Sequence, residues 1–167
     1  MSPSQASPHE QQAAIQAAGD AARVLLKALP KRDEELSISE KADGSLVSSA
    51  DLASQRAIQD CLQGTGVPIL SEEAAAPPFE ARRAWSRYWL VDPLDGTESF
   101  LKNRSGFAVN IALCDATGPI FGVVADPLAN RMYLGGVGAP VQVAPLDGST
   151  VKPLHPSPIQ RPYRLPP

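Results

Sequence analysis

Two pairs of carboxylates stand close behind short apolar runs, at points where strands are expected to end. Glu72 and Glu73 follow the run VPIL after a single serine. Asp92 and Asp95 lie in YWLVDPLDGT, directly after the apolar YWLV. If the two strands are neighbours, their ends bring three or four acids together, and clustered carboxylates repel one another unless a cation lies among them. Oxygen ligands of this kind suit a hard ion, so the pattern predicts a Mg²⁺ site.

The residues between and after the two aspartates support the same chemistry. Pro93 fixes a backbone angle, so that the carbonyl of Leu94 can be directed at the same ion. Gly96 permits a tight turn, and Gly96 and Thr97 would then present backbone N–H groups at a helix start, where anions bind. A metal beside a phosphate site indicates metal-assisted hydrolysis of a phosphoester.

Each of these motifs alone also has a simpler interpretation. Asp-Pro and Asp-Gly are common turn formers, and a Glu-Glu pair alone would begin a solvated loop. Asp51, in the segment SSAD, fits a capping box that ties down the start of a helix near Ser48. The joint occurrence of two acid pairs, each closing an apolar strand, favours the metal site.

Other catalytic and binding motifs do not fit the chain. With Gly96 at the centre of an EF-hand loop, Val91 and Pro93 would fill ligand positions, and neither binds calcium through its side chain. Neither a Walker A motif nor a complete dinucleotide-binding glycine motif occurs. The only histidines, His9 and His155, lie near the two ends, which leaves almost nothing for a histidine-based mechanism.

The elements that must position these residues follow the order helix, helix, then mostly strand. Apolar spacing and turn signals predict helices over 15–29 and 48–62, strands over 67–70 and 88–91, a helical turn over 98–101, and antiparallel strands over 107–115, 119–126 and 131–138. A polar loop with Pro77-Pro78 separates the first two strands, and a helix in it would be short. The second helix is expected to place Ala50, Ala53, Ala57 and Cys61 on one face. This order fits an α+β fold in which helices pack on a mostly antiparallel sheet.

The chain is expected to have three parts. Residues 1–8 are a loose leader, and residues 9–139 form the α+β domain. Residues 140–167 are rich in proline and show no helical or strand periodicity, which predicts a disordered tail.

The composition is that of a soluble globular protein, with 43% hydrophobic and 20% charged residues. A formal net charge of -3 gives no electrostatic reason to bind a nucleic-acid polymer or an anionic membrane. A small phosphorylated substrate remains compatible with this charge, and peripheral membrane association stays open. Cys61 and Cys114 stand inside regular segments, so no disulfide framework is indicated. Without a secretory signal or a membrane-length apolar run, the predicted location is the cytoplasm.

Taken together, ILSEE, WLVDPLDGTESF and FAVNIAL…GPIFGVVADP…MY resemble the inositol monophosphatase superfamily of Mg²⁺-dependent, lithium-sensitive phosphatases. RYWLVDPLDGT and the VNIAL segment are most similar to its 3′(2′),5′-bisphosphate nucleotidases of the CysQ type. The resemblance covers about residues 13–138. It implies the N-terminal half of a layered sugar-phosphatase fold. It also implies hydrolysis of 3′-phosphoadenosine 5′-phosphate to AMP and phosphate, in support of sulfate assimilation.

The resemblance also implies a role for each site residue. The metal ligands it implies for Mg²⁺ are Glu72, Asp92, the carbonyl of Leu94, and Asp95. The catalytic residues it implies are Asp51, Thr97 and Glu72, of which Asp51 and Thr97 orient the attacking water. The residues it implies for substrate and phosphate are Lys41, Glu72, Leu94, Asp95, Gly96 and Thr97. Lys41 falls in a loop that helps to bind metal and phosphate in relatives.

One feature of the family is missing from the sequence. Relatives are considerably longer, and their second half carries a W-D-x-A-A/P-G motif whose aspartate completes the metal site, whereas no Trp-Asp occurs here. We therefore expect a chain truncated or frame-shifted at its C-terminus, with impaired activity and an exposed apolar face that favours self-association. Two alternatives stay open. One is a phosphatase acting on inositol or other sugar phosphates, and the other is an inactive remnant that serves as a metal-binding, phosphate-binding or interaction module.

Overall fold

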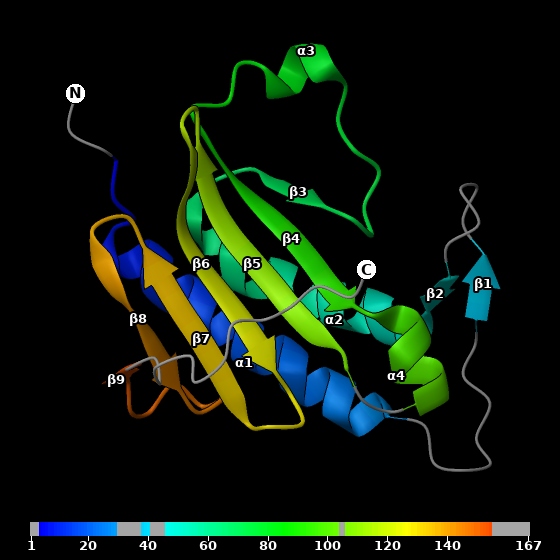
Figure 1. Cartoon of the computed structure of the whole chain (residues 1–167). Helices are drawn as coiled ribbons and strands as arrows, with labels where there is room; N and C mark the ends of the chain where they lie inside the picture. Colours follow the sequence, from blue (N-terminus) through cyan, green and yellow to red (C-terminus); the bar gives the residue numbers. More distant parts are fainter. Residues whose placement is uncertain (1–3, 30–37, 41–45, 104–105, 155–167) are drawn as a thin grey trace, which may run out of the picture.

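Two long helices pack on one face of a seven-stranded sheet (Figure 1). The computed structural model describes residues 4–29, 38–40, 46–103 and 106–154. The helices are α1 (Pro8–Ala28), α2 (Ser49–Leu62), α3 (Phe79–Arg82) and α4 (Thr97–Asn103), with a 3-10 turn η1 (Gln63–Thr65). The strands of the large sheet are β3 (Ile69–Ser71), β4 (Arg87–Asp95), β5 (Ala108–Asp115), β6 (Gly118–Asp126), β7 (Arg131–Gly136), β8 (Ala139–Ala144) and β9 (Lys152–Pro153). Strands β1 (Ile38–Glu40) and β2 (Leu46–Ser48) form a separate two-stranded sheet.

The strands of the large sheet lie in the order in which they occur along the chain, from β3 to β9. Strands β4 to β9 pair antiparallel with their neighbours, as short connections allow. Strand β3 pairs parallel with β4, and the segment that contains α3 forms the crossover between them. The predicted architecture, helices on a mostly antiparallel sheet, is confirmed.

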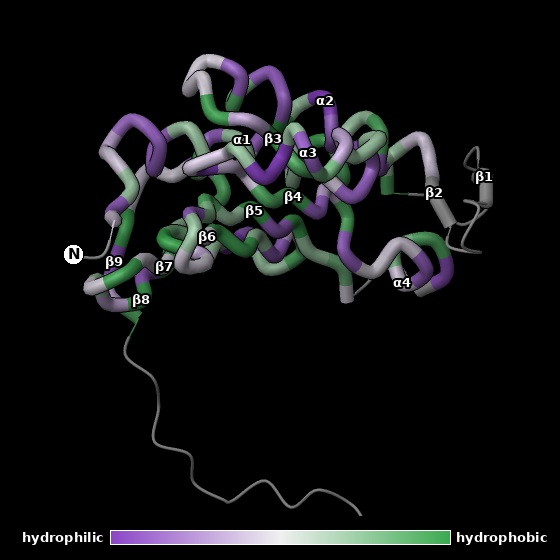
Figure 2. Tube along the Cα trace, turned by 90° about the horizontal axis from the view of Figure 1, so that it is seen from above, coloured by the Kyte–Doolittle hydropathy of each residue, from purple (hydrophilic) through white to green (hydrophobic). Residues whose placement is uncertain are grey.

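The core lies between the two helices and the covered face of the sheet. Helix α1 contributes a stripe of small side chains that are fully buried, Ala14, Ala17, Ala18, Ala21 and Ala22, and these let its backbone approach α2 and the sheet closely. The strands contribute alternate residues, as the period of two requires: Trp89, Val91, Val109, Ile111, Leu113, Val123, Ala125, Met132 and Leu134. Seen from above, α1 and α2 lie on one side of the sheet (Figure 2). Leu90, Val124 and Val141 are exposed and alternate with the inward-facing residues of their strands, so they lie on the other side.

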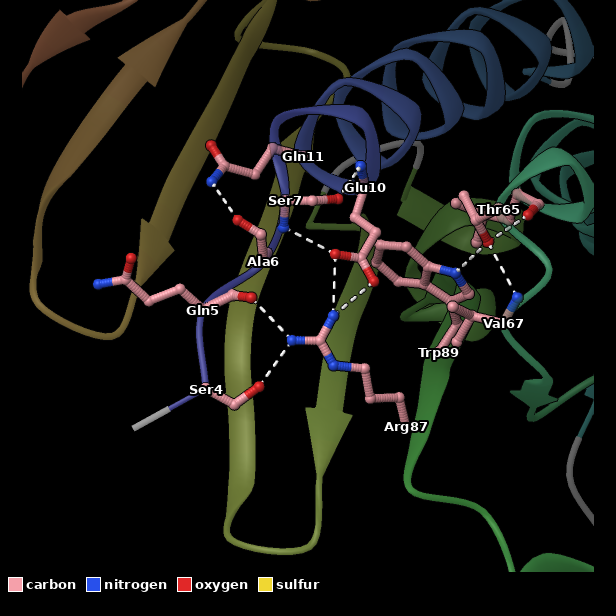
Figure 3. Close-up of polar contacts among 11 residues, drawn as sticks. Ser4, Gln5, Ala6, Ser7, Glu10, Gln11, Thr65, Val67, Arg87 and Trp89 are labelled. Atoms are coloured by element: carbon pink, nitrogen blue, oxygen red, sulfur yellow. Dashed lines mark hydrogen bonds and ion pairs between the residues drawn. The ribbon is translucent and has the colours of Figure 1, made fainter. Parts of the chain in front are cut away.

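The first turn of α1 anchors the start of β4 (Figure 3). Ser7 and Glu10 form a reciprocal capping box, and Glu10 also accepts two hydrogen bonds from the Arg87 guanidinium, at 2.8 and 3.0 Å. The same guanidinium donates to the Ser4 hydroxyl and to the Gln5 carbonyl, at 2.6 and 2.7 Å. Residues 4–7, expected to be part of a loose leader, are therefore bound to β4 in the structure.

The expectation that the chain forms no strand after residue 140 is wrong for β8. This strand pairs with β7 from Gly136↔Ala139 to Met132↔Ala144, and Ala144 is buried. The prolines near this strand argue against a strand in the sequence. They are compatible with one because Pro140 and Pro145 stand at its two ends, where fewer ladder hydrogen bonds are needed. The proposed boundaries at 8 and 139 stay predictions, and residues 155–167 lie outside the described part of the chain.

Candidate metal and phosphate site

The parallel pairing of β3 and β4 brings the two acid pairs to the same end of the sheet. Ser71 is in register with Val91, and the Glu72 N–H donates to the Val91 carbonyl at 3.1 Å. Glu72 therefore leaves β3 beside the point where Asp92 continues β4. The condition on which the predicted site depended, that the two strands are neighbours, is confirmed.

Asp92 carries the electrostatic signature of this arrangement. Burial, together with the negative charges of Glu72, Asp95 and Glu73, raises the pKa of Asp92 to about 7. The Leu94 N–H opposes the rise by donating to Asp92 Oδ1 at 3.2 Å. The ionised form of Asp92 is therefore electrostatically disfavoured in the metal-free fold. Binding a proton or a cation removes this cost.

The donors at this edge fit a hard cation in type, because they are carboxylates and a backbone carbonyl. Within the ranges that the structure describes, however, no three side chains of histidine, cysteine, aspartate or glutamate form a ready metal-binding group. The metal roles of Glu72, Asp92, Asp95 and the Leu94 carbonyl therefore stay predictions. Lys41 lies outside the described residues.

Asp51 joins the start of α2 to the start of α4. It is fully buried, and its Oδ2 accepts from the backbone N–H of Ser48 at 2.9 Å and from the Ser48 hydroxyl at 2.6 Å. Its Oδ1 lies 3.0 Å from the Thr97 hydroxyl. The capping box is confirmed, and the same carboxylate also binds the threonine with which the resemblance pairs it. One side chain therefore serves both interpretations.

The turn at Gly96 depends on glycine. Its φ is +85°, and a Cβ at this position would lie 2.7 Å from the Gly106 carbonyl oxygen. The Phe100 N–H donates to the Gly96 carbonyl at 2.9 Å, and α4 begins at the next residue, Thr97. The predicted tight turn into a helix is confirmed, whereas its contact with phosphate stays a prediction.

An open pocket of about 560 Å³ begins at these strand ends and extends over the uncovered face of the sheet. Its lining combines Glu72, Asp92 and Asn110 with exposed apolar residues such as Leu90 and Val124. Asn110, on β5, also donates from Nδ2 to Asp95 Oδ2 at 3.1 Å. The acidic end of the sheet and its exposed apolar face are therefore continuous.

Helix α2 contacts the site through residues that the sequence analysis missed. Ser54 donates to the Pro93 carbonyl at 2.7 Å, and Gln55 Oε1 accepts from the Ser71 hydroxyl at 2.5 Å. Of the four residues expected to share one face of α2, Ala50 is buried, whereas Ala53, Ala57 and Cys61 are half-buried. The residues that α2 buries are Ala50, Asp51, Ser54, Gln55, Ile58 and Leu62. The signal was available as polar residues at helical spacing from Asp51, but a rule that buries apolar residues discards it.

Two further expectations concern the chain as a whole. Cys61 and Cys114 are both free, as expected of a chain without a disulfide framework. None of the described helices combines the length and apolar character needed to span a membrane.

Comparison with known proteins decides the family. Residues 8–160 match the inositol monophosphatase family. The chain belongs to the inositol monophosphatase family. Within this family, 100 residues are 51% identical to the 3′(2′),5′-bisphosphate nucleotidase CysQ of Escherichia coli K12, an alignment that covers 59% of this chain and 40% of the relative. The CysQ of Haemophilus influenzae is 37% identical over 95 residues, which cover 56% of this chain and 35% of the relative.

Solved structures of the family agree with this assignment. The crystal structure of CysQ from Bacteroides thetaiotaomicron superposes with a TM-score of 0.70 at 35% identity, over 81% of this chain and 48% of that one. A family member complexed with Mg²⁺ and phosphate has a TM-score of 0.57 at 22% identity and shares the fold, over 64% of this chain and 41% of that one. The resemblance read from the sequence is confirmed. The chain spans about 40% of the length of the curated relatives it matches.

Proposed function

We propose that this site acts as a Mg²⁺-dependent 3′(2′),5′-bisphosphate nucleotidase, which hydrolyses 3′-phosphoadenosine 5′-phosphate to AMP and phosphate. The substrate follows from the similarity to CysQ nucleotidases. The observation that carries the reaction is the contact between buried Asp51 and Thr97, next to the end of β4 that holds Asp92 and Asp95. The chain spans about 40% of the length of such relatives, so the activity itself is part of the proposal.

In the proposed site, Mg²⁺ is held by Glu72, Asp92, Asp95 and the Leu94 carbonyl. The raised pKa of Asp92 supports this set, because neighbouring carboxylates that repel one another favour a bound cation. A relative complexed with Mg²⁺ and phosphate is consistent with it. When bound, the ion neutralises charge on the phosphate oxygens and makes a bound water more acidic.

The residues of this chain then orient water and phosphate. Thr97 has one hydroxyl hydrogen, and the Asp51 carboxylate, 3.0 Å away, is the stronger of its two acceptors. With that hydrogen directed at Asp51, the Thr97 oxygen keeps lone pairs that accept a hydrogen bond from water. We assign to this pair the orientation of the attacking water, with Glu72 as the third catalytic residue. Gly96, the backbone of Thr97, and Lys41 are assigned to phosphate contact.

The proposal is tested by phosphate release from 3′-phosphoadenosine 5′-phosphate with Mg²⁺, and again with lithium, which we expect to inhibit. Asp95→Asn is expected to abolish turnover. Glu80→Gln removes an exposed carboxylate of α3 that pairs with Arg83, so it is the matched control and should leave turnover unchanged. Wild-type turnover no higher than that of Asp95→Asn would refute the proposed activity. Faster release from inositol 1-phosphate would instead identify a sugar-phosphate phosphatase.

A second candidate is a metal-binding, phosphate-binding or interaction module without turnover. The exposed apolar residues Leu90, Val124 and Val141 on the sheet are suited to self-association. Light scattering tests this candidate: concentration-dependent dimers without phosphate release support it, and a stable monomer that turns over substrate contradicts it.

A further inference from the structure

Three buried polar residues share one face of α2, and each contacts a different segment of the site. Asp51, Ser54 and Gln55 are 0%, 0% and 5% exposed, and spacings of three and four residues align them along the helix. Asp51 binds the start of α4, Ser54 binds the end of β4, and Gln55 binds the end of β3. We propose that this polar face of α2 sets the relative positions of the three segments, with Ser54 and Gln55 as positioning residues. The inference rests on the proposed metal site.

Ser54 acts on the peptide that joins Pro93 to Leu94. Its hydroxyl donates to the Pro93 carbonyl at 2.7 Å, at one end of that peptide plane. The Leu94 N–H, at the other end of the same plane, donates to Asp92 Oδ1 at 3.2 Å. Because a peptide unit is planar, fixing its carbonyl also fixes the direction of its N–H. Ser54 therefore orients the Asp92 carboxylate through the backbone, without touching it.

Gln55 acts on the end of β3. Its Oε1 accepts from the Ser71 hydroxyl at 2.5 Å, and Ser71 in turn accepts from the Glu73 N–H at 3.4 Å. This pair holds the residues on both sides of Glu72 against α2. The helix is a regular element of 14 residues, so it can hold the strand ends more rigidly than a loop could.

The amide nitrogen of Gln55 indicates that this residue is not kept for stability. Gln55 Nε2 is buried, and no partner for it occurs among the residues that the structure describes. A buried donor without an acceptor lowers stability, and an apolar side chain of similar size would avoid that penalty. A residue that lowers the stability of the protein in this way fits a positioning role better than a packing role.

The test compares Mg²⁺ binding by the full chain in three variants, using calorimetric titration with Mg²⁺ alone. Ser54→Ala removes the contact to Pro93, and Gln55→Leu removes the contact to Ser71. Thr65→Val is the matched control, because the Thr65 hydroxyl accepts from Trp89 Nε1 at 3.0 Å near the other end of β4. Changes to residues behind metal ligands typically weaken binding by about 10- to 100-fold. We expect about tenfold weaker Mg²⁺ binding in the two site variants and unchanged Mg²⁺ binding in the control.

A second measurement decides the inference without metal. Amide hydrogen exchange at Leu94 should be faster in Ser54→Ala than in wild type, and unchanged in Thr65→Val. Equal Mg²⁺ affinity in all variants, or equal weakening in Thr65→Val, would overturn the inference and leave the proposed function standing. If wild type binds no Mg²⁺, the metal-site proposal fails instead, and exchange at Leu94 decides between a positioning role and none.

Discussion

Replacing Asp92 with asparagine is expected to stabilise the metal-free protein at pH 8 and to abolish its stabilisation by Mg²⁺. Asparagine keeps the size of the side chain and an Oδ1 that accepts from the Leu94 N–H, but it removes the negative charge. A pKa that rises from 3.8 to about 7 corresponds to roughly 4 kcal/mol against the ionised form. Because the carboxyl is only half-buried, solvent screening reduces this figure, and we expect about 1–2 kcal/mol.

The pH dependence has a definite sign. A carboxyl whose pKa is raised by folding binds its proton more tightly in the folded state. The contribution of Asp92 to wild-type stability is therefore greatest below pH 3.8, falls as the pH rises towards 7, and levels off above that value. At pH 4 the wild-type side chain is neutral in the folded protein and resembles asparagine. The advantage of Asp92→Asn should therefore be near zero at pH 4 and complete by pH 8.

The assay is urea denaturation at pH 4, 6 and 8, in EDTA and again with excess Mg²⁺. Mg²⁺ at ten times its dissociation constant should add about 1.4 kcal/mol to the wild type at pH 8 and nothing to Asp92→Asn. Asp60→Asn, which neutralises an exposed carboxylate of α2, is the control and should behave as wild type in both conditions. A metal-free Asp92→Asn less stable than wild type at pH 8 would refute the electrostatic reasoning. A surviving Mg²⁺ effect in that variant would refute the assignment of Asp92 as a ligand.

Three further predictions follow from single contacts. Gly96→Ala should lower the free energy of unfolding in urea by about 1–3 kcal/mol, because φ is positive and the added Cβ would lie 2.7 Å from a carbonyl oxygen. The control is Gly64→Ala, which should change stability little because no atom lies within 4 Å of the added Cβ. Equal losses in the two variants would contradict this prediction. Glu10→Gln should lose about 1–3 kcal/mol at pH 7. Burial alone would raise the pKa of Glu10, but its hydrogen bonds with Ser7 and Arg87 hold that pKa below 4.5. The stability lost in Glu10→Gln should therefore fade as the pH falls through the lowered pKa. A loss of stability that is unchanged at pH 3 would argue against the ion pair. Asn110→Ala removes the hydrogen bond from Asn110 to Asp95. It should weaken Mg²⁺ binding by about tenfold in calorimetry and change the free energy of unfolding by less than about 0.5 kcal/mol. An unchanged Mg²⁺ affinity would exclude a positioning role for Asn110.

Most of the fold and part of the site could be predicted from the sequence. Strands β3 to β7 have strong local signals, since each is a run of apolar residues bounded by turn residues. Within the site, one short segment contains Asp92, Asp95, Gly96 and Thr97, so their arrangement depends mainly on one strand end and one turn. The link between Asp51 and Thr97 was available only through the resemblance, because 46 residues separate the two positions.

The parts that could not be predicted depend on contacts between distant segments. Helix α2 buries polar residues because Asp51, Ser54 and Gln55 each bond to a residue of another element, which no periodicity rule can anticipate. Ser4 and Gln5 are held in place because the Arg87 guanidinium, more than 80 residues away in the sequence, donates hydrogen bonds to both. Strand β8 exists because β7 offers an edge to pair with, although its own segment is flanked by prolines.

The parallel pair of strands explains why the acidic residues meet at all. In an antiparallel pair, the residues that follow two strands leave from opposite ends of the sheet, and Glu72 and Asp92 would then lie a strand length apart. The parallel register of Ser71 with Val91 instead makes both acidic segments leave from the same end. That pairing requires a long crossover, which the segment containing α3 supplies. An insertion in the exposed crossover should therefore leave Mg²⁺ binding intact, whereas a change that shifts β3 by one residue along β4 should abolish it, since it turns the side chain of Glu72 to the other face of the sheet.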